Sequence, residues 1–366
     1  MKFETARGAV LPARLRERPV SFFEFWPGWL FYAPIVAQWI ALGLRHGDMS
    51  LPTAANPLIT GGGLCGESKV SILDQVSETG RRWLVPYTSL VTGPTSRGDL
   101  AAAGNALDRA GIGFPLVAKP DIGCNGTGVR LIADRDRLGQ YLDQFPRRCG
   151  VMLQEFAPEE GEAGIFYVRE PGDGPGRITS ITFKHAPHVT GDGHSTLRRL
   201  ILCDPRAGRV PHLYLPRLAG RLEQVPARGE RVRLVFVGNH CKGSVFENAT
   251  DQATPALAAA IERIARALPE FHFGRLDIRF ASLAALRRGE GFRIIEINGA
   301  GSEATHVWDP VTTLREAWRA QFFHYGAAFR IGAANRARGH RPTGLRALFH
   351  LWRTQRRLMA AYPPND

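Results

Sequence analysis

Residues 271–298, FHFGRLDIRFASLAALRRGEGFRIIEIN, decide the fold class. They predict two strands, 271–281 and 292–298, because each is a short apolar run with polar residues interleaved. Similar patterns earlier in the chain predict more strands with glycine-rich turns between them, and two helices that open on an Asp and a Thr cap. These strands are expected at 114–120, 128–133, 151–157, 164–170, 178–185 and 231–238, and the helices at 134–145 and 254–269. The chain is therefore expected to be a mixed α/β (α+β) protein.

Four polar side chains on the last two strands predict a metal site. Alternate residues of a strand share a face, so Arg275 lies beside Asp277, and Glu296 beside Asn298. Charged groups on such apolar strands are costly unless they are paired or hold a metal ion. Carboxylate and amide oxygens at adjacent strand ends suit Mg²⁺, which binds one or two carboxylates together with nucleotide phosphates. The alternative is a structural ion pair between Arg275 and Glu296.

A lysine and a glycine-rich turn predict a phosphate site. Lys119 ends the strand 114–120, and Gly123, Gly126 and Gly128 follow it. Glycines let backbone N–H groups approach phosphate oxygens, and the ammonium adds a point charge. A glycine-rich hairpin without a ligand is the alternative interpretation, because such turns are common in α/β proteins.

Two further segments fit the same ligand. The main chain of 155–157 could hydrogen-bond an adenine and Glu162 could bind ribose hydroxyls, although a solvated acidic turn is the favoured interpretation of this segment taken alone. Lys184 ends another strand, ahead of a loop that contains Gly191, Asp192 and Gly193. Together these segments predict a nucleotide site distributed along the chain.

The net charge of the chain limits the classes of binding partner that are expected. The chain has 47 Lys and Arg residues against 34 Asp and Glu, a formal net charge of +13. Such a charge attracts nucleic acid, anionic lipid or small anions. The arginines are scattered and no nucleic-acid-binding motif is present, so no nucleic-acid partner is expected. Lysine is so rare here that it is expected where a compact ammonium is needed; the five lysines are Lys2, Lys69, Lys119, Lys184 and Lys242.

In combination, these motifs resemble the ATP-grasp superfamily, and most of all the carboxylate–amine ligases of the D-alanine:D-alanine ligase and cyanophycin synthetase kind. The resemblance covers roughly residues 65–310 and implies two α+β subdomains that grip ATP between them. It implies nucleotide contacts by Lys69, Lys119, Gly123, Gly126, Gly128, Gln154, Glu155, Phe156, Ala157, Glu162 and Lys184. It also implies that Asp277, Glu296 and Asn298 hold one or two Mg²⁺ ions, with Mn²⁺ as a substitute.

The activity implied by the resemblance is ATP-dependent amide-bond formation through an acyl phosphate, with ADP as a product. Arg275 and Lys184 are implied as catalytic residues, and the loop 191–197 as a lid over the phosphates. His194 in that loop is a candidate base or substrate contact, or an exposed histidine without a role. Ser302, Glu303 and His306 are expected near the acceptor substrate, and the segment 239–248 makes Lys242 a candidate contact to an acidic substrate. A kinase acting on a small or lipid-linked substrate and a membrane-surface nucleotide-binding adaptor are the alternatives.

The N-terminal region differs from that of the resembling enzymes, and the C-terminal tail is a separate arginine-rich segment. Residues 20–44 are aromatic and nearly uncharged but too short to span a bilayer, so a buried helical hairpin or an interfacial segment is expected. The tail from 331 holds seven arginines, and its apolar residues at helical spacing predict docking through Leu345, Phe349 and Trp352, or a helix on anionic lipid. Peripheral membrane contact is thus left open for 22–44 and 344–362.

The expected organisation has four parts and a cytoplasmic setting. Five cysteines without a C-x-x-C pair predict neither a disulfide framework nor a zinc site, and the first residues lack a secretory pattern. A cytoplasmic location, with attachment at the inner membrane face left open, and small-molecule carboxylate and amine substrates are expected; a homodimer is also left open. The predicted parts are an aromatic-rich region 1–82, a small ATP-grasp subdomain 83–153, a larger one 154–330 that carries the metal site, and a basic amphipathic tail 331–366.

Overall fold

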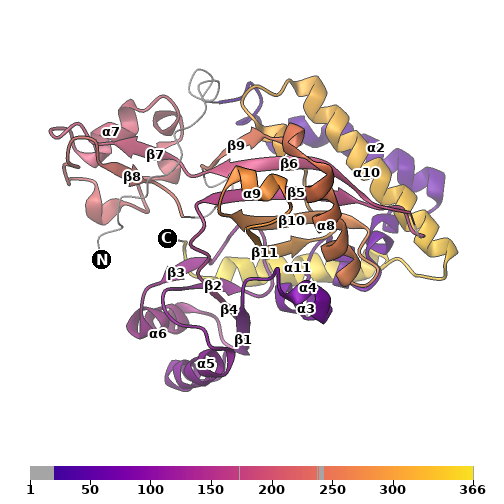
Figure 1. Ribbon diagram of the computed structural model, residues 1–366, viewed down its shortest axis with the longest axis horizontal. Coiled ribbons are helices and arrows are strands. Elements are labelled where there is room, and N and C mark those ends of the chain that lie inside the picture. Colours follow the sequence, from indigo (N-terminus) through magenta and orange to yellow (C-terminus); the bar gives the residue numbers. More distant parts are fainter. Residues whose placement is uncertain (1–19, 173, 237, 239–242, 366) are drawn as a thin grey trace.

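The computed structural model describes residues 20–172, 174–236, 238 and 243–365. Its strands form a four-stranded sheet, a five-stranded sheet and a two-stranded ribbon, and all the pairings are antiparallel. Helices cover the two larger sheets (Figure 1). The mixed α+β fold class predicted from the sequence is confirmed.

The four-stranded sheet has the order β1-β4-β2-β3. Its strands are β1 (Tyr87–Val91), β2 (Leu116–Pro120), β3 (Arg130–Ile132) and β4 (Gly150–Glu155), with helices α5 (Ser96–Ala110) and α6 (Arg135–Gln144). The Asp134 side chain accepts from the Arg137 N–H and caps α6, as the sequence predicts. The two helices pack on the sheet through a core that contains Leu107, Leu138 and Tyr141.

The five-stranded sheet has the order β11-β10-β5-β6-β9. Its strands are β5 (Gly161–Val168), β6 (Arg177–His185), β9 (Val245–Asn248), β10 (Phe273–Phe280) and β11 (Phe292–Asn298). Helix α8 (Pro255–Ala267), capped by Thr254, buries Ile261 and Ile264 in the largest apolar cluster together with Ile165 and Leu276. Short elements surround the sheet: α3 (Lys69–Asp74), α4 (Glu78–Arg81), α9 (Leu283–Arg287), and the 3₁₀ turns η7 (Thr250–Gln252) and η8 (Thr305–Trp308).

A small lobe lies between β6 and β9 in the chain and projects from the large sheet (Figure 1). It contains β7 (His188–Thr190), α7 (Leu197–Cys203), β8 (Arg231–Arg233) and the 3₁₀ turns η3 (Ala207–Arg209), η4 (Pro211–Leu213) and η5 (Ala219–Arg221). The lobe has its own core around Leu197, Ile201 and Tyr214. The strand expected over 231–238 ends at Arg233, whose guanidinium bonds the carbonyls of Val235 and Phe236 where the chain leaves the ribbon.

The aromatic segment 20–44 does not form the expected helical hairpin. It forms one helix, α2 (Gly28–His46), which starts directly after Pro27 and continues through Pro34. Pro27 is the N-cap, where a missing N–H costs no helical bond, whereas Pro34 lies inside the helix and removes one backbone donor. Only Phe31, Ile35 and Gly43 of this helix are buried. Among the described residues no helix is both long enough and apolar enough to cross a membrane.

Helices α10 (Leu314–Ala337) and α11 (Leu345–Ala361) complete the chain. Helix α10 packs on α2 and on the 3₁₀ turn η1 (Leu51–Ala55), and it crosses the expected boundary at 330/331. Helix α11 does not dock through Leu345, Phe349 and Trp352, whose exposures are 59%, 53% and 44%. The neighbouring face of the helix carries the contacts of Leu348, Leu351, Leu358 and Met359. Both sets of apolar residues recur at helical spacing. The prediction that Leu345, Phe349 and Trp352 form the buried set is wrong. The four-part division of the chain stays a prediction.

Candidate active site

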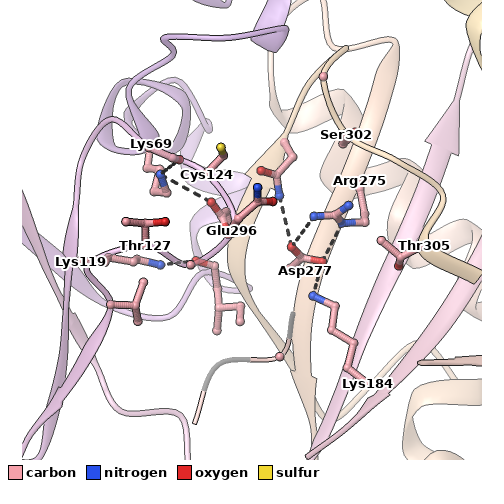
Figure 2. Close-up of a pocket in the computed structure, with 18 of the residues that line it drawn as sticks. Lys69, Lys119, Cys124, Thr127, Lys184, Arg275, Asp277, Glu296, Ser302 and Thr305 are labelled. Atoms are coloured by element: carbon pink, nitrogen blue, oxygen red, sulfur yellow. Dashed lines mark hydrogen bonds and ion pairs between the residues drawn. The ribbon is translucent and has the colours of Figure 1, made fainter. Parts of the chain in front are cut away.

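The two larger sheets border one cavity of about 550 Å³. Its lining includes predicted nucleotide residues from both sheets, which are far apart in the sequence. Figure 2 shows Lys69 and Lys119 on one side of this cavity and Lys184, Arg275 and Asp277 on the other. The lining residues predicted from the sequence are Lys69, Lys119, Gly123, Gly126, Gln154, Glu155, Phe156, Ala157, Glu162, Lys184, Arg275, Asp277, Glu296 and Asn298. Gly128 does not line the cavity, although its neighbours Thr127 and Val129 do, and a Cβ on it would meet Pro120 and Tyr362.

The pairing of β10 with β11 assembles the metal-site residues. Arg275 is opposite Asn298 and Asp277 is opposite Glu296, so all four lie on one face of the sheet. Directly after this pair the register shifts, which leaves Ile295 as a bulge. The bulge turns both Ile295 and Glu296 toward the cavity. The predicted shared face of Arg275, Asp277, Glu296 and Asn298 is therefore present, and Ile295 also points toward the cavity.

Asp277 is the centre of a buried charge cluster. Arg275 donates from Nε and Nη2 to its two oxygens at 2.9 and 3.1 Å, and Lys184 Nζ donates to Oδ1 at 2.9 Å. Asn298 Nδ2 donates to Oδ2 at 3.2 Å. Burial alone would raise the pKa of Asp277, but the Arg275 and Lys184 cations outweigh it and lower that pKa to about 2. Asp277 is therefore a carboxylate at any physiological pH.

The structural ion pair proposed as the alternative is formed by a different acid. Arg275 pairs with Asp277, whereas Glu296 lies 3.8 Å from Lys69 Nζ. Glu296 has a partly exposed side chain, at 28%, so it keeps access to the cavity. The Arg275–Asp277 pair and a ligand role for Glu296 are compatible.

The side-chain oxygens of Asp277, Glu296 and Asn298 suit a Mg²⁺ ion that is also bound by phosphate oxygens. Two carboxylates and the amide oxygen of Asn298 are hard ligands, and Mg²⁺ prefers one or two carboxylates plus phosphate oxygens to a cage made by protein alone. In the described part of the chain no three His, Cys, Asp or Glu side chains form a complete metal cage. The donor set thus suits a metal that arrives with a nucleotide.

Lys119 is held rigidly at the border of the two sheets. Its ammonium donates to Gln154 Oε1 and to the carbonyl of Ile295, both at 2.9 Å. The bulge on β11 exposes this carbonyl, so the register shift also positions the lysine. Burial lowers the pKa of Lys119 to about 8, although the carboxylates of Glu296 and Asp277 oppose the shift.

The acid expected at the ribose is paired with two cations. Glu162 lies 3.5 Å from Lys184 Nζ and 3.0 Å from Arg279. The Glu155 side chain, in the expected adenine segment, pairs with Arg293 at 2.7 Å. Both acids remain in the cavity lining, so their ligand roles stay predictions.

The loop 191–197 lies apart from the cavity lining. Its Asp192 accepts from the N–H groups of His194 and Ser195, which lowers the pKa of that carboxyl. The His194 side chain is 79% exposed and contacts Asp192. A catalytic role for His194 stays a prediction that needs the loop to move. Lys242 is outside the described residues.

Two features of the cavity were not expected. The segment TGGG (60–63) pairs with the chain just after Asn298: Ala300 N–H donates to the Gly62 carbonyl and Gly301 N–H to the Gly63 carbonyl. A side chain on Gly63 would meet the Gly299 backbone at 2.6 Å, so the glycines permit this close approach. The second feature is Glu67, whose Oε2 is buried and has no partner within the described residues. Burial raises its pKa.

The part of the cavity around Ser302 and Glu303, which were expected near the acceptor substrate, includes Tyr32 of the N-terminal aromatic region. Glu303, expected near the acceptor, accepts from Tyr32 Oη at 2.6 Å, Gln321 Nε2 at 2.6 Å and Trp308 Nε1 at 3.1 Å. Ser302 also lines the cavity. His306 does not: it bonds Ser180 and is half-buried, and its partial removal from water lowers its pKa to about 4. The sequence carries no signal for a role of Tyr32 in the cavity, because it is one of many aromatic residues in the segment 20–44.

With these motifs at one cavity, the chain resembles ATP-grasp carboxylate–amine ligases. No family model matches it. The bifunctional glutathione biosynthesis protein GshAB of Streptococcus mutans serotype c is 25% identical over 215 residues, which are 53% of this chain and 28% of that protein. The chain thus spans little more than a quarter of the curated relative it matches.

Solved structures give a partial likeness. The D-alanine–D-alanine ligase of Bacillus anthracis overlaps with a TM-score of 0.42 and 14% identity, over 77% of this chain and 70% of the ligase. The VanG D-Ala:D-Ser ligase of Enterococcus faecalis overlaps with a TM-score of 0.40 and 13% identity, over 73% of this chain and 63% of that ligase.

Proposed function

We propose that the protein is an ATP-dependent carboxylate–amine ligase that forms an amide bond through an acyl phosphate. The observation that carries the proposal is the convergence on one cavity of three lysines, Arg275 and the oxygen donors of β10 and β11. The curated relative, a bifunctional glutathione biosynthesis protein, supports the same class of chemistry.

The first step would transfer the γ-phosphoryl group of ATP to a carboxylate oxygen of the substrate. The bond between the β–γ bridging oxygen and the γ-phosphorus breaks, ADP leaves, and the carboxylate becomes a mixed anhydride. Such a transfer depends on positioning and charge neutralisation. Lys119 and Lys184 are suited to the phosphates, and Mg²⁺ held by Asp277, Glu296 and Asn298 would neutralise the charge that develops on them.

The second step would join the amine to the activated carbonyl. The amine nitrogen attacks the carbonyl carbon, the tetrahedral oxyanion collapses, and phosphate leaves with the former carboxylate oxygen; the amine proton is lost to a base. The Arg275 side chain is 17% exposed and is aligned by Asp277, so its guanidinium is preorganised for an oxyanion. We propose that the loop 191–197, with His194, closes over the phosphates to exclude water.

The substrate test is a screen of ADP formation. Purified protein with Mg·ATP is incubated with pairs of amino acids, dipeptides and other carboxylates and amines, and ADP and phosphate are measured together. A ligase forms ADP and phosphate in equal amounts only when both substrates are present. ADP without phosphate, and without dependence on an amine, would instead identify a kinase.

The charge state of Lys119 predicts a pH dependence of ATP binding. The pKa of Lys119 lies near 8 in the free protein, and bound phosphate raises it, so binding takes up a proton above pH 8. By linkage the Kd for ATP is expected to rise above pH 8, by at most about tenfold per pH unit. Calorimetric titrations between pH 7.5 and 9.5 measure this slope. In Lys119→Met binding should be weaker and the slope absent; equal slopes in both proteins would contradict the role of Lys119.

We propose, second, that the outer faces of α2 and α11 contact an anionic bilayer. Trp29 and Leu44 on α2 are 74% and 71% exposed, and Phe349 and Trp352 on α11 are more than two-fifths exposed. Neither helix contains an acidic residue, and α11 carries four arginines. Apolar and cationic side chains on one amphipathic helix match the chemistry of an anionic lipid surface. A cytoplasmic setting with peripheral attachment is part of this proposal.

Vesicle flotation tests this surface. The protein is expected to float with vesicles of phosphatidylglycerol and phosphatidylcholine at low salt and to remain behind with phosphatidylcholine alone. The double variant Phe349→Ser/Trp352→Ser should lose most of this binding. The matched control is Leu202→Ser, because Leu202 is 49% exposed on the small lobe. Flotation that is equal in both variants, or absent in the unaltered protein, would refute a lipid surface.

A further inference from the structure

Helix α11 and the residues after it run along the glycine-rich loop. The Asn365 carboxamide makes two bonds to that loop: Oδ1 accepts from Gly128 N–H at 2.9 Å, and Nδ2 donates to the Gly126 carbonyl at 2.5 Å. A single side chain therefore fixes a donor and an acceptor of the loop backbone at once.

Tyr362 fixes the start of the same loop. Its hydroxyl donates to the Ile122 carbonyl at 2.8 Å, and its ring stacks on Phe145 of the small sheet's core at 5.2 Å. The side chain is 9% exposed. Gly123 has a φ of 154° and Gly128 one of 75°, so the loop has a backbone that glycine adopts freely and that needs outside support to stay in one shape.

The middle of α11 reaches the segment that precedes Lys69. Gln355 Oε1 accepts from Gly66 N–H at 2.5 Å, and Gln355 also lines the cavity. Lys69 Nζ in turn donates to the Gly123 carbonyl at 2.6 Å. One helix thus braces two separate segments that border the predicted phosphate site.

The contacts of residues 362–365 lie outside the cavity. Loop residues 123–127 line the cavity, whereas Tyr362 and Asn365 do not. The two side chains hold the loop from behind and leave its inner side open to a ligand. This arrangement differs from a plug, in which the chain itself would fill the nucleotide site.

We infer that Tyr362 and Asn365 are positioning residues that hold the glycine-rich loop in its nucleotide-binding shape before ATP arrives. The inference rests on the proposed ATP-dependent function for its consequence, but its structural claim concerns the free protein. Ordering a glycine-rich loop costs conformational entropy, and a loop ordered in advance leaves less of that cost to the binding step.

The first measurement is hydrogen–deuterium exchange of peptides that cover residues 122–130, without nucleotide. In Asn365→Ala the exchange is expected to be about five- to tenfold faster, because two loop bonds lose their partner. Tyr362→Phe keeps the stacked ring and should accelerate exchange at the start of the loop. Thr354→Ala on the exposed face of α11 is the control and should leave exchange unchanged. Exchange that is identical in all four proteins overturns the inference.

The second measurement separates binding from turnover. Asn365→Ala is expected to raise the Kd and KM for ATP about five- to tenfold, with kcat at saturating ATP within about twofold of the unaltered protein. Faster exchange with an unchanged Kd would overturn the positioning role. If the unaltered protein does not bind ATP, the proposed function fails, while the exchange result still decides whether these residues order the loop.

Discussion

Arg275→Ala is expected to lower the rate of ADP formation by about 10²- to 10³-fold, the usual cost of removing one preorganised donor to a developing oxyanion. The guanidinium is held by both oxygens of Asp277 and is mostly enclosed, so we expect no other side chain to take its position. The protein should remain folded, because Asp277 keeps Lys184 at 2.9 Å and Asn298 at 3.2 Å.

Rates of ADP formation and thermal melting curves, measured on the same preparations, test this variant. Arg288→Ala is the matched control, because Arg288 is an exposed arginine on the turn before β11 whose ion-pair partner is Glu290. The control should keep full activity. Turnover near the original rate in Arg275→Ala, in a folded protein, would show that Arg275 does not act on the reacting atoms.

Glu296→Gln is expected to reduce turnover by about 10²-fold or more, since the substitution replaces a proposed charged metal ligand with a neutral one of the same shape. The concentration of Mg²⁺ needed for half-maximal activity should rise as well. Little else changes, because within the described residues the ion pair of Glu296 is the long contact to Lys69 Nζ at 3.8 Å, and the substitution preserves the bulge that positions Glu296.

Initial rates over a range of Mg²⁺ concentrations measure both effects. Glu290→Gln, an exposed acid just before the same strand, is the control and should behave as the unaltered protein. If Glu296→Gln loses activity with an unchanged Mg²⁺ requirement, Glu296 acts otherwise than as a ligand. If it loses none, the metal site lies elsewhere.

The sequence predicted the shared face of β10 and β11 because strand alternation is a local property. Arg275, Asp277, Glu296 and Asn298 lie together as expected. The bulge at Ile295 was not predictable, because FRIIEIN fits a regular strand equally well and only the packing of Ile294 and Ile297 on the core selects the shifted register.

The parts missed by the sequence depend on contacts between distant segments. Asn56 bonds the backbone of Gly62, His272 and Phe273, and so attaches the N-terminal region to β10. Nothing in the neighbourhood of Asn56 in the sequence marks this role. Helix α11 has two apolar stripes, and tertiary packing alone decides which of them is buried.

The most direct test of the proposed chemistry follows one oxygen atom. The carboxylate substrate found in the screen is labelled with ¹⁸O in both oxygens and turned over with Mg·ATP and its amine. An acyl-phosphate mechanism predicts that each phosphate released carries one ¹⁸O and that the amide product keeps the other. Phosphate without label, or phosphate that stays bonded to the substrate, would contradict amide formation through an acyl phosphate.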